Sequence, residues 1–247
     1  MHGLKTGAAL AVNVCIALLI SGCVSPQKDF ATSSDASLRK VPPVTQGQFG
    51  TIEIEGFQVP LQEGDWVEIG TIDQTTDPNF PAKSHVLVSE SGGVIDRIVI
   101  ISRQSALGSK QFGEFASCLD SSNLASEVIS YASATADCTY VRAVPWLGGG
   151  DFGKMLSDYG GERNAYVPLV TVGPRIALNL APNERIAKDY CFNPDLIAPN
   201  PNGDAWRPED WAAGSAAGLS QVEVIKAMQS FGATVRSQIK QGNSVVS

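Results

Sequence analysis

Residues 85–102 read HVLVSESGGVIDRIVIIS, and this stretch indicates the fold class of the chain. Two runs rich in β-branched residues, 85–89 and 94–102, flank the turn sequence ESGG at residues 90–93. Glycine tolerates the positive φ angles that tight hairpin turns require. The second run ends in consecutive apolar residues, which is typical of a strand buried on both faces. We therefore expect an antiparallel hairpin with one central strand.

Other segments extend this sheet on both sides of the hairpin. Runs with apolar-polar alternation or strand-like composition occur at 51–55, 66–69, 139–144, 165–172 and 175–180. Alternation with period two is typical of strands that have one solvated face. Gly173 and Pro174 separate the last two runs, and this dipeptide signals a turn. The pattern predicts a mostly antiparallel sheet.

A long amphipathic helix is predicted near the C-terminus. Ser220 and Glu223 have the spacing of a capping box, and Gly242 is placed to end the helix. Between them an apolar stripe recurs at three- and four-residue steps, at Val224, Ile225, Met228, Phe231, Gly232, Val235 and Ile239. Residues 112–133 show weaker helical patches. We expect an α+β fold, with a mostly antiparallel sheet and the long C-terminal helix packed on it.

The N-terminus has the layout of a secretory signal peptide. Lys5 precedes an apolar run at residues 7–20, which is too short to span a bilayer comfortably. The following motif, Ile20-Ser21-Gly22-Cys23, resembles the lipobox of bacterial lipoproteins. This resemblance implies cleavage after Gly22 and acylation of Cys23, whose two or three chains would hold the protein at a membrane. An ordinary cleaved signal or an uncleaved anchor are the alternatives.

The lipobox resemblance also implies a cellular location and a domain organisation. Val24 follows Cys23, whereas aspartate at that position is the retention signal for the inner membrane; in a diderm bacterium the expected location is therefore the periplasmic face of the outer membrane. This organisation comprises a signal peptide at 1–22, an acylated N-terminus with a polar, flexible tether at 23–47, and a single periplasmic α+β domain at 48–247.

Charge and cysteine content restrict the partners and the compartment. The chain has 18 basic and 25 acidic residues, and removal of Lys5 with the signal leaves 17 − 25 = −8. This balance disfavours nucleic acid and anionic lipid surfaces as partners. Cys118, Cys138 and Cys191 allow three single-disulfide pairings. We favour Cys118 with Cys138, which leaves Cys191 as a buried free thiol.

Short motifs for cofactors and metals are incomplete. Residues 148–154, GGGDFGK, match two phosphate-binding patterns, but Met155 replaces the required Ser or Thr, and no acidic residue follows at the dinucleotide spacing. We expect a mobile glycine loop. An EF-hand pattern around residues 198–209 begins with Ala198 in place of aspartate. The sequence therefore predicts no cofactor, no nucleotide and no metal site.

Catalytic residues are equally sparse, which makes the enzyme assignment uncertain. His85 is the only histidine after signal removal, and no GxSxG motif is present. Carboxylates that could serve a glycosidase occur in two groups: Asp151, Asp158 and Glu162, and Asp204, Glu209 and Asp210. A periplasmic hydrolase acting on glycan or peptide through such carboxylates or through His85 is the alternative function.

The favoured function is a non-enzymatic binding or assembly module for a protein partner or a glycan of the envelope. The candidate binding loop contains Trp206, Glu209, Asp210 and Trp211, because tryptophan faces stack on sugar rings and these acidic residues lie beside the two tryptophans in the sequence. No internal repeat is present at solenoid or propeller periods, which excludes those architectures.

Overall fold

A computed structural model describes the fold of most of the chain from Phe49 onward. The described residues are 49–54, 56–74, 77–113, 115–130, 136–146, 150–212 and 218–243. The predicted signal peptide, Cys23 and tether lie outside them, as do Gly148 and Gly149 of the glycine run. No helix among the described residues is long and apolar enough to cross a membrane.

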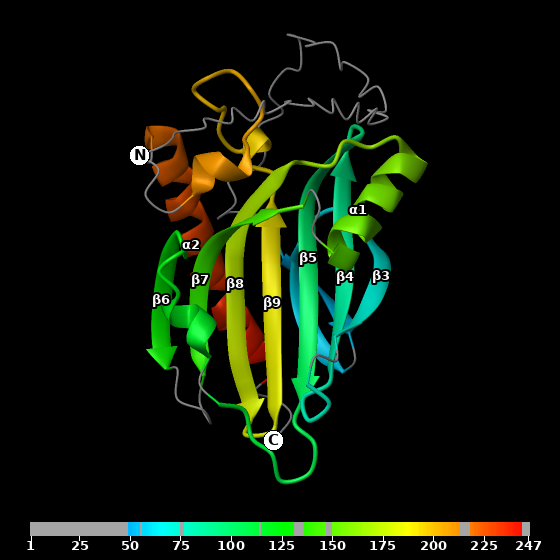
Figure 1. Cartoon of the computed structure of the whole chain (residues 1–247), viewed down its shortest axis with the longest axis vertical. Helices are drawn as coiled ribbons and strands as arrows, with labels where there is room; N and C mark the ends of the chain where they lie inside the picture. The colour runs from blue at the N-terminus through cyan, green and yellow to red at the C-terminus, as the bar shows by residue number, and fades with distance from the viewer. Residues whose placement is uncertain are drawn as a thin grey trace, which may run out of the picture. The chain divides into compact units, whose positions relative to one another are not determined.

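A seven-stranded antiparallel sheet forms the centre of the fold (Figure 1). Its strands are β3 (Trp66–Gln74), β4 (Ala82–Ser91), β5 (Val94–Ser105), β6 (Ala125–Ser130), β7 (Asp137–Pro145), β8 (Val170–Ala181) and β9 (Glu184–Phe192). Their spatial order is β3-β4-β5-β9-β8-β7-β6. The predicted β4–β5 hairpin is confirmed: Ser91 pairs with Val94, and Gly92 and Gly93 have φ angles of 62° and 79°.

The long C-terminal helix, α2 (Leu219–Asn243), packs on one face of this sheet, as predicted. A two-stranded hairpin, β1 (Phe49–Ile54) and β2 (Phe57–Gln62), contacts α2 on the same side. The buried stripe of α2 consists of Val224, Met228, Phe231, Val235 and Ile239. The predicted α+β class with a mostly antiparallel sheet is confirmed. Side chains of the sheet and of α2 form one shared core, and burying their apolar surface stabilises the packing of the two layers.

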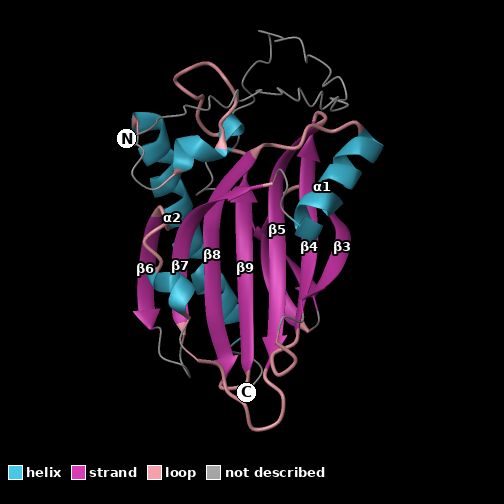
Figure 2. Cartoon of the chain, viewed as in Figure 1, coloured by secondary structure: helices cyan, strands magenta, loops and turns pink. Residues whose placement is uncertain are grey.

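The other face of the sheet carries the shorter helix, α1 (Gly150–Arg163) (Figure 2). Successive strand residues alternate between the two cores: Val99 and Ile101 of β5 face the α2 side, whereas Ile98 and Ile100 face α1. The prediction of a mobile loop at the glycine run is wrong from Gly150 onward, because α1 begins at that residue. Leu156 anchors α1 by burying its side chain in the second core.

Three local predictions were wrong at the level of single elements. Residues 112–133 contain a 3₁₀ turn (Ala116–Leu119) and strand β6 in place of helical patches, because pairing with β7 overrides the weak helical pattern. Gly173-Pro174 lies inside continuous β8. The α2 start uses Gly218, whose N–H donates to the Gln221 side chain, in place of the Ser220–Glu223 box.

The close approach of β9 and α2 to β8 explains why β8 continues through Gly173-Pro174. A Cβ on Gly173 would lie 1.6 Å from the Tyr190 carbonyl oxygen, so only glycine admits the backbone of β9 at this distance. Pro174 contacts α2 where Gly232 leaves room, since a Cβ on Gly232 would lie 2.9 Å from Pro174 Cβ. The two residues that signal a turn therefore serve packing inside a strand.

Candidate functional site

A pocket of about 370 Å³ lies at the open edge of β7. Its walls come from β7, from the loop around the 3₁₀ turn at residues 116–119, and from a second 3₁₀ turn, Pro208–Trp211. β6 pairs with β7 only as far as Ala125 opposite Val141. Three of the remaining β7 residues, Arg142, Ala143 and Pro145, line the pocket between the two turns and form its floor.

Arg142 supplies a fixed positive charge to this pocket. Its Nη2 donates to Asp189 Oδ1 at 2.9 Å, and Arg175 Nη1 donates to the other carboxylate oxygen at 2.9 Å. Burial alone would lower the pKa of Arg142, but the neighbouring Asp189 carboxylate raises it above its ordinary value. The Nε of Arg142 is buried and has no hydrogen-bond partner among the described residues.

Trp211 brings a second unpartnered donor to the same pocket. Its side chain is 4% exposed, and its Nε1 has no acceptor in the described structure. The other three indoles all donate: Trp66 to Gln62 O, Trp146 to Thr171 Oγ1 and Trp206 to Ala198 O, at 2.7 to 2.9 Å. A buried N–H without an acceptor costs ~1–3 kcal/mol.

One carboxylate, Asp120, contributes to the lining of this pocket. The backbone N–H of Ser122 donates to Asp120 Oδ1 at 2.8 Å, and this bond lowers the pKa of the exposed carboxyl. Asn123 closes the same loop by donating to Ser117 O at 2.8 Å. The wall opposite Trp211 is therefore an ordered turn that carries one ionised acid.

A disulfide between Cys118 and Cys138 fastens this loop to β7, and Cys191 remains a free, buried thiol. This is the pairing that the sequence favoured. Both sulfur atoms lie in a small core with Tyr140, which also lines the pocket. Burial raises the pKa of Cys191 to about 12, so that thiol is unreactive near neutral pH.

Replacing both Cys118 and Cys138 by serine is expected to lower the free energy of unfolding by ~3 kcal/mol, because the bond closes a loop of 20 residues in the unfolded chain. Urea denaturation of the oxidised protein and of the double variant measures this difference. Cys191→Ser is the control for loss of a buried sulfur. Equal stability of the double variant and the oxidised protein would contradict a structural role for the bond.

The predicted binding loop is only partly at this pocket. Trp206 and Trp211 are buried with ring centroids 4.9 Å apart, so they offer no exposed stacking surface; Trp211 alone borders the pocket. Glu209 is exposed and lies 4.0 Å from Arg207. Asp210 accepts from the Arg207 N–H at 2.9 Å and so shapes the turn. Sequence analysis missed Arg142, since nothing in its neighbours along the chain distinguishes it.

Comparisons of the chain with protein-family models, with curated proteins and with solved structures gave no match. The geometry of the pocket is therefore the basis for any functional assignment.

The residues considered for hydrolysis lie elsewhere. His85 Nδ1 is 2.7 Å from Glu68 Oε1, on neighbouring strands β4 and β3. Asp158 pairs with Lys154 at 2.5 Å on the exposed side of α1. Among the described residues, no group of three or more His, Cys, Asp or Glu side chains is arranged to hold a metal ion.

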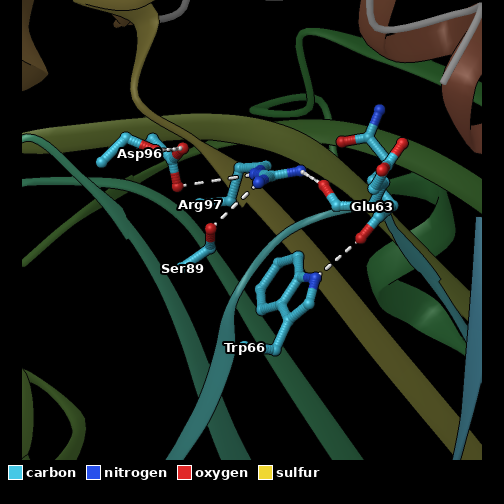
Figure 3. Close-up of polar contacts among 7 residues, drawn as sticks. Glu63, Trp66, Ser89, Asp96 and Arg97 are labelled. Atoms are coloured by element: carbon cyan, nitrogen blue, oxygen red, sulfur yellow. Dashed lines mark hydrogen bonds and ion pairs between the residues drawn. The ribbon is translucent and has the colours of Figure 1, made fainter.

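A second polar cluster near β3 shows how a structural arginine is bonded in this fold (Figure 3). Arg97 donates to Glu63 O and Ser89 Oγ, each at 2.9 Å, and to Asp96 Oδ1 at 3.5 Å. Its guanidinium also stacks on Trp66 at 5.1 Å from the ring centroid. The Nε, Nη1 and Nη2 atoms of Arg97 all have acceptors, which distinguishes it from the arginine in the pocket.

Proposed function

We propose that the mature protein is an envelope lipoprotein, held by acyl chains on Cys23 at the periplasmic face of the outer membrane, and that it is a binding module. The β7 pocket is its ligand site. The observation that carries this proposal is a pocket beyond the end of the β6–β7 pairing that is lined by the 35% exposed side chain of Arg142 and by Trp211. The proposal extends the lipobox resemblance, which supplies the anchor.

The chemistry of the pocket favours binding over hydrolysis. Glycoside hydrolysis needs two carboxyl groups that flank the bond to be broken, whereas Asp120 is the one carboxylate among the described residues that line the pocket. Hydrogen bonding keeps Asp120 ionised and unable to act as a general acid. The histidine that could activate a nucleophile, His85, is not part of the pocket lining. The fixed donors suit recognition of acceptor atoms.

Site-specific photo-crosslinking in cells tests the proposal. A photoreactive phenylalanine analogue replaces Ser122 at the pocket, and the matched control carries it at Gln229, an exposed position on α2. We expect a discrete adduct from position 122 and none from position 229. Absence of an adduct at 122, or the same adducts from both positions, would contradict a binding site at the pocket.

The proposed anchor has its own test. Cys23→Ser removes the thiol that would be acylated, so the variant is expected to accumulate as an uncleaved precursor without lipid. Metabolic labelling with palmitate and gel mobility measure both changes, and Cys191→Ser is the control. Normal processing and membrane retention of the Cys23→Ser protein would contradict acylation at this residue.

A further inference from the structure

We infer that the pocket receives the C-terminal end of a peptide, which adds to β7 as a short strand and places its carboxylate on Arg142. This inference rests on the proposed binding function and names the ligand class for the same pocket.

The open edge of β7 provides the main-chain half of the site. Leu124 N–H donates to Val141 O at 2.9 Å, so the polar backbone groups of Val141 face β6. Groups on one side of a strand recur every second residue, which places the N–H and C=O of Ala143 on the same side. The β6–β7 pairing ends at Val141, and Ala143 lines the pocket. An entering peptide strand can pair with Ala143.

Arg142 provides the charged half. Within the described part of the chain, Asp189 holds the guanidinium through Nη2 alone, and the side chain is 35% exposed. A terminal carboxylate accepts two parallel N–H bonds from such a fork, and charge-assisted bonds of this kind are stronger than neutral ones. Trp211 and Pro208 form the wall beside the floor, where the Nε1 of Trp211 lacks an acceptor. Main-chain pairing and carboxylate binding therefore occur within one pocket.

The charge balance favours a single carboxylate over a polyanion such as a phosphate group. Asp189 already offsets part of the charge on Arg142, and Asp120 adds an ionised carboxylate to the same lining. Both acids would repel a doubly charged anion about twice as strongly as a monoanion, so a single carboxylate at the end of a neutral peptide backbone meets the donors at a lower electrostatic cost.

Calorimetric titration of the acylated protein in detergent micelles tests the inference. The probes are an acetylated tetrapeptide of alternating threonine and valine with a free C-terminal carboxylate, and the same peptide as its C-terminal amide. We expect the acid to bind at least tenfold more tightly than the amide, and the backbone amide signal of Ala143 to shift with the acid in nuclear magnetic resonance spectra. Equal affinity for acid and amide would overturn the carboxylate contact.

Two variants test the carboxylate contact and the main-chain pairing one at a time. Arg142→Lys keeps the charge and the pairing with Asp189 but loses the planar fork, so a tenfold loss of affinity for the acid is expected. Ala143→Pro removes the edge N–H at a position where an edge strand tolerates proline, and is expected to weaken the acid and the amide alike. Arg103→Lys, on β5 beside Glu184, is the matched control and should bind normally.

The outcomes distinguish this inference from the proposed function. If neither peptide binds while position 122 still crosslinks in cells, the ligand class is wrong and the binding function stands. If neither peptide binds and no crosslink forms, both proposals fail. Normal affinity of both Arg142→Lys and Ala143→Pro would place the peptide outside this pocket and contradict the inference.

Discussion

Replacing Lys188 by methionine is expected to raise the free energy of unfolding at pH 6 by ~3–5 kcal/mol, because a buried ammonium group is desolvated without an adequate partner. Lys188 is 0% exposed, on the α2 side of β9 between Ile101 and Ile176. Its Nζ is 3.4 Å from the Gln58 carbonyl oxygen. Methionine has a similar length and volume, so the apolar contacts of the core are retained.

The effect depends on pH in a defined direction. Burial lowers the pKa of Lys188 from 10.5 to about 7 in the folded protein. Between these values the unfolded chain binds a proton that the folded protein has released, so the stability of the wild type rises with pH. Relative to Lys188→Met, the wild type is expected to gain ~2–3 kcal/mol between pH 7 and pH 9 and to change little below pH 6.

Urea denaturation of both proteins at one-unit pH intervals from 5 to 9 measures this difference directly. The comparison with the methionine variant removes the contribution of all other titrating groups that the two proteins share. Parallel stability curves across this range would contradict a lowered pKa of the buried Lys188 amine.

Replacing Asp189 by alanine is expected to lower the free energy of unfolding by ~3–5 kcal/mol, because it leaves the charges of Arg142 and Arg175 without their shared partner. The carboxylate is 4% exposed and accepts one bond from each arginine at 2.9 Å. The same change is expected to abolish binding of the free-acid peptide, since the guanidinium of Arg142 loses the contact that orients it. Chemical denaturation and calorimetric titration measure the two effects.

An exposed ion pair supplies the control for this experiment. Asp158→Ala breaks the pair with Lys154 on the surface of α1, where such pairs contribute ~0–1 kcal/mol. A loss of stability in Asp189→Ala no larger than in Asp158→Ala would contradict a central role for the buried carboxylate. Normal peptide affinity of a folded Asp189→Ala protein would contradict its role in positioning Arg142.

Sequence patterns predicted the elements that have a strong local signal, such as a turn sequence or a periodic apolar stripe. The β4–β5 hairpin follows from Gly92 and Gly93, and α2 from the three- and four-residue spacing of its apolar stripe. Predictions failed where tertiary contacts overrode local signals. Gly173-Pro174 is typical of a turn, yet the close approach of β9 and α2 keeps it within a strand.

The pocket could not be predicted from sequence for a related reason. Its donors and its acid are far apart in the chain: Asp120 in a loop, Arg142 on β7 and Trp211 in a 3₁₀ turn. The pairing order of the strands and the Cys118–Cys138 bond bring these segments together. The sequence indicated the tryptophans as a binding surface, but burial leaves only the indole of Trp211 at the pocket.

The indole N–H signals of the tryptophans test the central claim most directly. Trp211 and Trp206 lie side by side, but among the residues that the structure describes only the Nε1 of Trp206 has an acceptor, the Ala198 carbonyl at 2.8 Å. The measurement is a nitrogen-15 correlation spectrum of the purified protein with and without a soluble extract of bacterial envelope. We predict that the Trp211 signal shifts while that of Trp206 stays in place. An unchanged Trp211 signal, or equal shifts of both indoles, would contradict ligand binding at the pocket.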